Sequence, residues 1–197
     1  QLFARTNVSG LEVIFVRTQD IPGIVGMGAA DLGVTGHDLI RESESDVEEL
    51  LDLDFGKARM VVAAHGESSI DSIDDVTEGT KVATEFPTVT KRYFEEIGID
   101  VKISEVTGAT EITPFIGMAD LIVDISSTGT TLRTHGLEVL DTLFETSVRL
   151  IANKESIQKN KEKIEEIKTA IESVIQAKPR KLLLMNAPED KVASIKE

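Results

Sequence analysis

The stretch Glu111–Leu132, EITPFIGMADLIVDISSTGTTL, decides how this chain folds. Ala119–Ile125 is a short apolar run with the length of a buried strand, and Asp124 lies near its C-terminal end. The segment Ser126–Thr131 that follows is small, rich in hydroxyl groups and interrupted by a glycine, and helix-forming residues come after it. A strand, a turn and a helix start in this order direct several backbone N–H groups toward one point. Proteins hold phosphate in this way without a large positive charge.

Two residues in this stretch extend the prediction from phosphate to a sugar phosphate. Gly129 lets the backbone approach a ligand closely and can adopt a positive φ. Asp124, at the strand end beside the turn, suits the two hydroxyl groups of a ribose. The alternative is that Ser126–Thr131 is only a polar turn that caps a helix, since short Ser/Thr/Gly runs are common.

Composition excludes several classes of protein. The 197 residues carry a formal net charge of −14, which argues against a general nucleic-acid or membrane-surface binder. Apolar residues make up 41% of the chain and charged residues 28%, as in ordinary globular proteins. There is no cysteine, and no apolar run is long enough to span a bilayer, so we expect a cytoplasmic protein. An anionic ligand would have to be held by local groups rather than by the overall field.

The wider pattern resembles the signature of the ATP phosphoribosyltransferase family, which begins histidine biosynthesis. The resemblance rests on Glu111, Gly117–Ala119, Ile122–Ile125 and Thr128–Leu132 and on their spacing. It implies transfer of the phosphoribosyl group of 5-phosphoribosyl 1-diphosphate to N1 of ATP with release of pyrophosphate. It also implies a donor site with Glu111 and Asp124 near the ribose hydroxyls. The implied donor-binding residues are Glu111, Asp124, Ile125, Ser126, Ser127, Thr128, Gly129, Thr130 and Thr131.

The remaining chemistry is assigned through the same resemblance. Arg17, with Mg²⁺, would balance the charge of the departing pyrophosphate, and Arg17, Asp20 and Thr84 would bind ATP. Glu111 and Asp124 would act as catalytic carboxylates that favour positive charge on the ribose ring. The alternatives are a surface ion pair for Arg17 and a helix cap for Asp20. The metal ligands remain unassigned. The family further implies histidine as a feedback inhibitor and a homo-oligomer, either a dimer or a hexamer.

Two similar α/β lobes are expected. Gly28–Leu32, GAADL, echoes Gly117–Leu121, GMADL, and each copy ends a predicted helix and starts a predicted strand. The resemblance implies the two-lobe fold of periplasmic binding proteins, type II. Residues 1–62 and 153–178 would form catalytic lobe I, and residues 63–152 would form lobe II. Residues 180–197 would begin the ferredoxin-like α+β regulatory domain of the long-form enzymes, so we expect a chain that is shortened at both ends.

Three local predictions can be compared directly with a structure. Periodicity predicts one long amphipathic helix over 156–178, and a coiled-coil seam would give a similar stripe. Residues 108–117 are predicted as a helix that contains Glu111, and residues 139–152 as extended structure that returns to the first lobe. A two-lobe solute-binding protein without catalysis is the main alternative function, and a non-catalytic regulatory subunit is a third.

Overall fold

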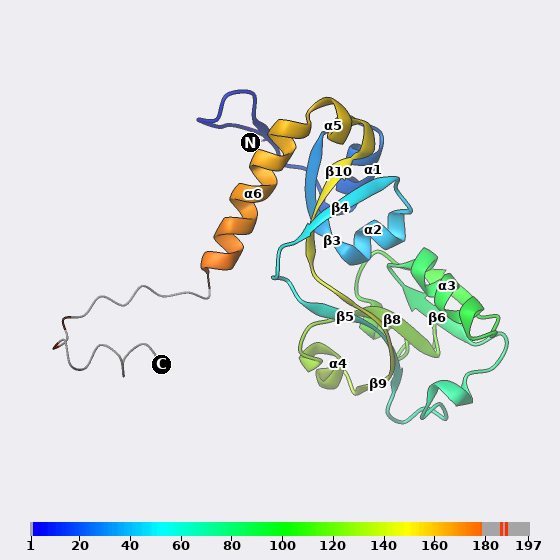
Figure 1. Ribbon diagram of the computed structural model, residues 1–197. Helices are drawn as coiled ribbons and strands as arrows, with labels where there is room; N and C mark the ends of the chain where they lie inside the picture. The colour runs from blue at the N-terminus through cyan, green and yellow to red at the C-terminus, as the bar shows by residue number, and fades with distance from the viewer. Residues whose placement is uncertain (1, 179–185, 187, 189–197) are drawn as a thin grey trace.

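The chain forms two α/β lobes that are joined by two extended crossings (Figure 1). The computed structural model describes residues 2–178, 186 and 188. Within them, one lobe contains a three-stranded sheet in the order β3-β10-β4, and the other contains a five-stranded sheet in the order β7-β6-β8-β5-β9. A separate antiparallel hairpin, β1-β2, lies at the start of the described chain. The regulatory domain predicted for 180–197 lies outside the described residues.

The first lobe packs short helices on its small antiparallel sheet. Val25, Ile40 and Ile151 form its core, each 9% exposed or less. The strands are β1 (Phe3–Arg5), β2 (Glu12–Ile14), β3 (Leu32–Gly36), β4 (Val47–Asp52) and β10 (Val148–Asn153). The helices are η1 (Thr18–Asp20), α1 (Ile21–Gly26), α2 (His37–Ser43), α5 (Lys154–Lys159) and α6 (Lys161–Ala177).

The second lobe is built around β8, whose residues Leu121, Ile122 and Val123 are fully buried. Its strand β8 pairs in parallel with β6 and antiparallel with β5. A run without polar interruption is what a strand covered on both faces requires. The strands are β5 (Ala58–His65), β6 (Lys81–Thr84), β7 (Lys102–Glu105), β8 (Leu121–Ser126) and β9 (Leu137–Thr146). The helices are η2 (Ile73–Asp75), α3 (Pro87–Glu96), η3 (Thr110–Ile112) and α4 (Thr130–Thr134).

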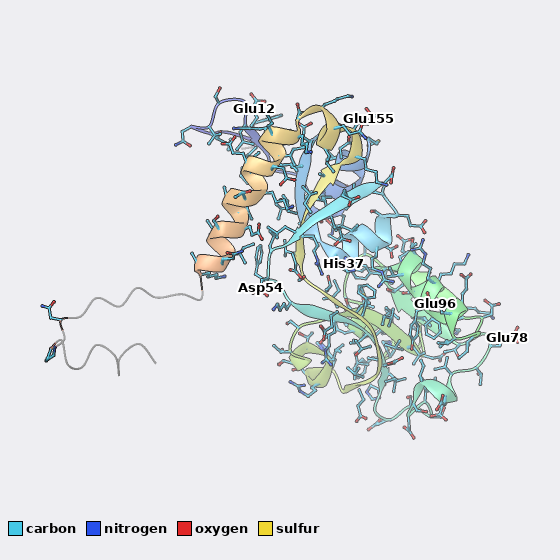
Figure 2. The ribbon with its side chains drawn as sticks, viewed as in Figure 1. Glu12, His37, Asp54, Glu78, Glu96 and Glu155 are labelled. Atoms are coloured by element: carbon cyan, nitrogen blue, oxygen red, sulfur yellow. The ribbon has the colours of Figure 1, made fainter. Side chains whose placement is uncertain are left out.

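Sheet membership places the crossings at slightly different residues from those expected. The first crossing lies between β4 and β5, because Ala58 already pairs in the second sheet. The second crossing lies at Ser147, because Val148 already pairs in the first sheet. The labelled Asp54 marks the first crossing in Figure 2. By this criterion residues 58–62 belong to the second lobe and residues 148–152 belong to the first lobe. Both boundaries between the lobes, expected at 62/63 and 152/153, therefore lie a few residues earlier in the chain.

Two predicted helices are wrong in detail. The helix expected over 156–178 is two helices separated at Asn160, where the backbone leaves helical geometry (φ −119°, ψ 29°). Residues 108–117 do not form a helix. They contain only the single turn η3 followed by further turns, because Ala109 takes a left-handed conformation and Pro114 lacks the N–H that a continuing helix needs.

The two lobes contact each other through α2 and α3. The Glu42 carboxylate, on α2 of the first lobe, accepts hydrogen bonds from Thr88 N at 2.9 Å and from Val89 N at 3.0 Å. These amides belong to the first turn of α3, where N–H groups have no partner within the helix. Nearby, Glu44 pairs with Arg92 across the same junction. Glu42 therefore caps a helix of the opposite lobe.

Replacing this interlobe cap should lower stability more than replacing the neighbouring ion pair. Glu42→Ala leaves two amides of α3 without their acceptor, so we expect a loss of about 1–2 kcal/mol in the free energy of unfolding. Glu44→Ala is the matched control, and its exposed pair should contribute about 0–1 kcal/mol. Urea unfolding of both variants measures the difference. Equal losses would show that Glu42 is an ordinary surface acid.

Candidate functional site

A shallow polar pocket lies at the carboxyl end of β8. It is lined by Glu111, Asp124, Ile125, Ser126, Ser127, Thr128, Gly129, Thr130, Thr131 and Leu132. Every residue that the sequence assigned to the phosphoribosyl donor is among them, so the structure brings this predicted set together in one place. The carboxyl end of a strand in an α/β sheet is the usual place for a ligand.

The loop keeps its shape through hydrogen bonds between its own residues. Gly129 takes a left-handed φ of 71°, which a residue with a side chain rarely adopts. Its N–H donates to Ser126 Oγ at 3.0 Å, and Thr130 N donates to Thr128 Oγ1 at 3.3 Å. Within the described part of the chain, no hydrogen bond engages the Thr128 or Thr131 amides. Of the four amides of Thr128, Gly129, Thr130 and Thr131, two are therefore unengaged, and the other two are held by hydroxyl groups that a ligand could replace.

Carboxylates gather around this pocket. Burial raises the pKa of Asp124 to about 6, and the negative charges of Glu85 and Glu111 add to this effect. The Ile125 N–H, which donates to Asp124 Oδ1 at 2.7 Å, opposes the shift. A ligand that brings positive charge or hydroxyl donors would stabilise the ionised form of this acid. Ribose hydroxyls and an electron-poor ribose ring are such partners.

Glu85 is a member of this cluster that sequence reasoning missed. Strands β6 and β8 are parallel neighbours with Thr84 opposite Val123, so the next residues, Glu85 and Asp124, emerge at the same sheet edge. The Glu85 carboxylate also lies toward the segment before η3, where Oε1 is 3.8 Å from the position of a Cβ built on Gly108. Glu85 directly follows β6, which ends at Thr84. Recognising it required the strand pairing.

None of the residues predicted to bind ATP lines this pocket. Arg17 directly precedes η1 in the first lobe and Asp20 is the last residue of η1; both are exposed, and neither lines the pocket. No described ion pair joins them, and Asp20 makes no side-chain cap to α1. Thr84 is fully buried, and its hydroxyl donates to Val123 O at 2.8 Å. The Thr84 side chain is thus engaged inside the second lobe, and its contact with ATP remains a prediction.

The described residues contain no group of three or more His, Asp or Glu side chains that could hold a metal ion. This fits Mg²⁺ only as an ion that is bound mainly by substrate phosphates, with one or two carboxylates from the protein. Asp124 and Glu111 are the residues of this pocket with suitable oxygen atoms. No helix in the part of the chain that the structure describes is long and apolar enough to cross a membrane.

Fold and site together define a class of protein. A two-lobe α/β chain carries a small-residue loop with available amides at one strand end, and this loop is flanked by carboxylates. Amides suit a phosphate and carboxylates suit sugar hydroxyls, so the arrangement is that of a sugar-phosphate site.

Comparison with known proteins identifies the family. The family model described as ATP phosphoribosyltransferase matches residues 17–173. The ATP phosphoribosyltransferase of Methanocaldococcus jannaschii is 52% identical over 200 residues, which cover all of this chain and 69% of that protein. A solved ATP phosphoribosyl transferase (HisG:HisZ) complex from Thermotoga maritima matches with 30% identity and a TM-score of 0.79, over 89% of this chain and 88% of that one.

The chain belongs to the ATP phosphoribosyltransferase family. This confirms the enzyme class predicted from the sequence, a pentosyltransferase of histidine biosynthesis, and does not favour a solute-binding protein without catalysis. The substrate binding protein of an amino acid ABC transporter shares the fold, with a TM-score of 0.57 at 17% identity over 81% of this chain and 69% of that one. The type II two-lobe fold is confirmed by these similarities.

The raised pKa of Asp124 predicts a pH-dependent gain in stability for Asp124→Asn. The folded protein holds the Asp124 proton up to about pH 6, whereas the ordinary carboxyl loses it near 3.8, so this group's contribution is greatest at low pH and declines as pH rises between these values. The asparagine variant should therefore gain about 2 kcal/mol over wild type on going from pH 4.5 to 7.5. Urea unfolding at both pH values measures the gain. Asp71→Asn, at an exposed site, controls for loss of one negative charge.

A gain that is the same at both pH values would contradict the burial of an ionised Asp124. The control variant should show no comparable change with pH.

Proposed function

We propose that this protein transfers the phosphoribosyl group of 5-phosphoribosyl 1-diphosphate to ATP at the pocket formed by the end of β8. In this reaction, the lone pair of adenine N1 forms a bond to C1 of the ribose. The bond from C1 to the diphosphate oxygen breaks, and pyrophosphate leaves with that electron pair. The observation that carries the proposal is the pocket itself, which combines the loop Ser126–Thr131 with two carboxylates.

The residues of the pocket divide the work between two parts of the donor. The amides of Thr128 and Thr131, with the loop hydroxyls, would bind the 5-phosphate. Glu111 and Asp124 would accept hydrogen bonds from the ribose hydroxyls and stabilise positive charge as it develops on the ring. Because Asp124 is partly desolvated, its interaction with that charge is stronger than it would be in water.

ATP and the metal complete the proposal. Arg17, Asp20 and Thr84 would contribute to the ATP site, and Arg17 would also offset the charge of the departing pyrophosphate. Mg²⁺, held by the diphosphate and by Asp124 or Glu111, would supply further positive charge at the leaving group. A homo-oligomer of two or six copies and a cytoplasmic location, both implied by the family resemblance, belong to this proposal.

The test is turnover of ATP and 5-phosphoribosyl 1-diphosphate to phosphoribosyl-ATP by the full-length protein, followed optically. Gly129→Val should raise the KM for the phosphoribosyl donor by about tenfold or more. Valine cannot adopt the φ of 71° without strain, and its Cβ would lie 2.8 Å from Arg133 Nη1. The KM for ATP should stay within about twofold of wild type. A folded valine variant with an unchanged donor KM would remove the loop from the site.

Histidine is proposed as a feedback inhibitor of the full-length protein. We expect it to bind away from the donor site, so that activity falls without direct competition against 5-phosphoribosyl 1-diphosphate. Isothermal calorimetry of full-length protein with histidine measures this binding, and a variant that ends at Pro179 should lose both binding and inhibition. Absence of heat with the full-length protein would contradict the regulatory role.

A further inference from the structure

Arg133 lies folded back over the loop that the site uses for phosphate. Its Nη2 donates to Thr128 O at 3.1 Å and to Thr130 Oγ1 at 3.3 Å. Its Nη1 lies 2.8 Å from the position that a Cβ on Gly129 would take. In the described residues, Arg133 is the only arginine or lysine whose side chain hydrogen-bonds to the segment Ser126–Thr131, and His135 Nδ1 lies 2.9 Å from Thr131 O.

This cation has no carboxylate partner in the structure. None of the ion pairs among the described residues includes Arg133. The chain carries a net charge of −14, and the charged residues that line the pocket, Glu111 and Asp124, are both acidic. None of the described hydrogen bonds or ion pairs of Arg133 is made with an acid. Here its guanidinium bonds to a carbonyl and a hydroxyl group of the loop instead.

A simpler explanation is that Arg133 only complements the dipole of α4. It does lie in the last turn of that helix, where a cation is favourable. Its head group, however, does not contact the C-terminal carbonyl groups. It reaches back past Gly129 to Thr128 O, at the opposite end of the helix. The dipole of α4 explains why an arginine is favourable at position 133. It does not explain why the guanidinium contacts the loop before the helix.

We propose that Arg133 is a positioning residue for the phosphoribosyl donor, which acts through Thr128 and Thr130 and is specific to that substrate. The inference rests on the proposed function. The Nη2 group engages the Thr128 carbonyl oxygen, which would otherwise be free to repel a phosphate. The same nitrogen fixes the Thr130 hydroxyl, and the positive charge beside the loop offsets the acids of the pocket.

The same geometry accounts for the glycine at position 129. A side chain there would occupy the space of Arg133 Nη1 and displace the guanidinium from the loop. Changes at the two positions should therefore be non-additive. In a Gly129→Ala background, the further change Arg133→Gln should raise the donor KM by less than it does in the wild-type chain, because alanine has already displaced the guanidinium.

The experiment compares Arg133→Gln and Arg133→Lys by steady-state kinetics of the full-length protein. Glutamine keeps some hydrogen-bonding capacity and loses the charge, so the KM for 5-phosphoribosyl 1-diphosphate should rise about tenfold. Lysine keeps the charge without the planar fork, so the rise should be about threefold. The KM for ATP and kcat should stay within about twofold of wild type, because the residue does not touch ATP or the reacting atoms. Lys91→Gln, an exposed lysine on α3, controls for loss of one positive charge.

Calorimetric titration of each variant with 5-phosphoribosyl 1-diphosphate separates binding from turnover. Weaker binding by the glutamine variant, with partial recovery by lysine and unchanged thermal unfolding, supports the positioning role. An unchanged donor KM in Arg133→Gln, or equal rises in the KM values of both substrates, would overturn it. If the wild-type protein binds the donor but forms no phosphoribosyl-ATP, the proposed function fails, while the binding comparison still tests Arg133.

Discussion

The pairing of β8 with two different neighbours is the constraint on which the site depends. The parallel ladder with β6 brings Glu85 to the edge where Asp124 emerges. The antiparallel ladder with β5 sets Ser126 opposite Arg59, at the start of β5. The first crossing between the lobes ends at Ala58, the first residue of β5. Ala58 pairs with Thr146, the last residue of β9, and the second crossing begins directly after Thr146. The loop is therefore held at the sheet edge next to both crossings, so a change in the angle between the lobes would act beside the loop proposed to bind phosphate.

Groups at the same edge of the sheet explain how a strongly acidic chain can bind an anionic donor. A chain with a net charge of −14 must hold a polyanionic donor, and its pocket contains two acids. Backbone amides and hydroxyl groups attract phosphate without adding charge to the chain, and Arg133 adds one local cation. The acids lie on the side assigned to the ribose, where burial raises the pKa of Asp124 to about 6. In the proposed site, neutral donors bind the phosphate and acidic groups bind the sugar, and both kinds of group come from a short stretch of chain.

The sequence alone predicted those parts of the structure that depend on local residue patterns. The buried strand and the loop followed from an apolar run and a small-residue turn, and the residues assigned to the donor do line one pocket. The break at Asn160 was missed because neither Pro nor Gly marks it and the apolar stripe continues through it. The stripe itself is only partly used, since Ile164 is 3% exposed while Val174 is 70% exposed. Glu85, Glu42 and Arg133 were missed because their roles depend on strand pairing or on contacts between elements that the sequence does not display.

The contact between the lobes limits how they can move. Glu42 accepts from two amides of α3, and α3 follows β6, the strand that delivers Glu85 to the site. Beside the second crossing, the Thr146 hydroxyl donates to Asp38 Oδ1 at 2.6 Å, and Arg41 lies 4.1 Å from the ring centre of Phe144. Asp38, Arg41 and Glu42 all lie on α2, so this helix holds both the crossing and the first turn of α3. Separating the lobes would have to break the two hydrogen bonds from α3 to Glu42 as well as the bond from Thr146 to Asp38, so both contacts of α2 resist opening.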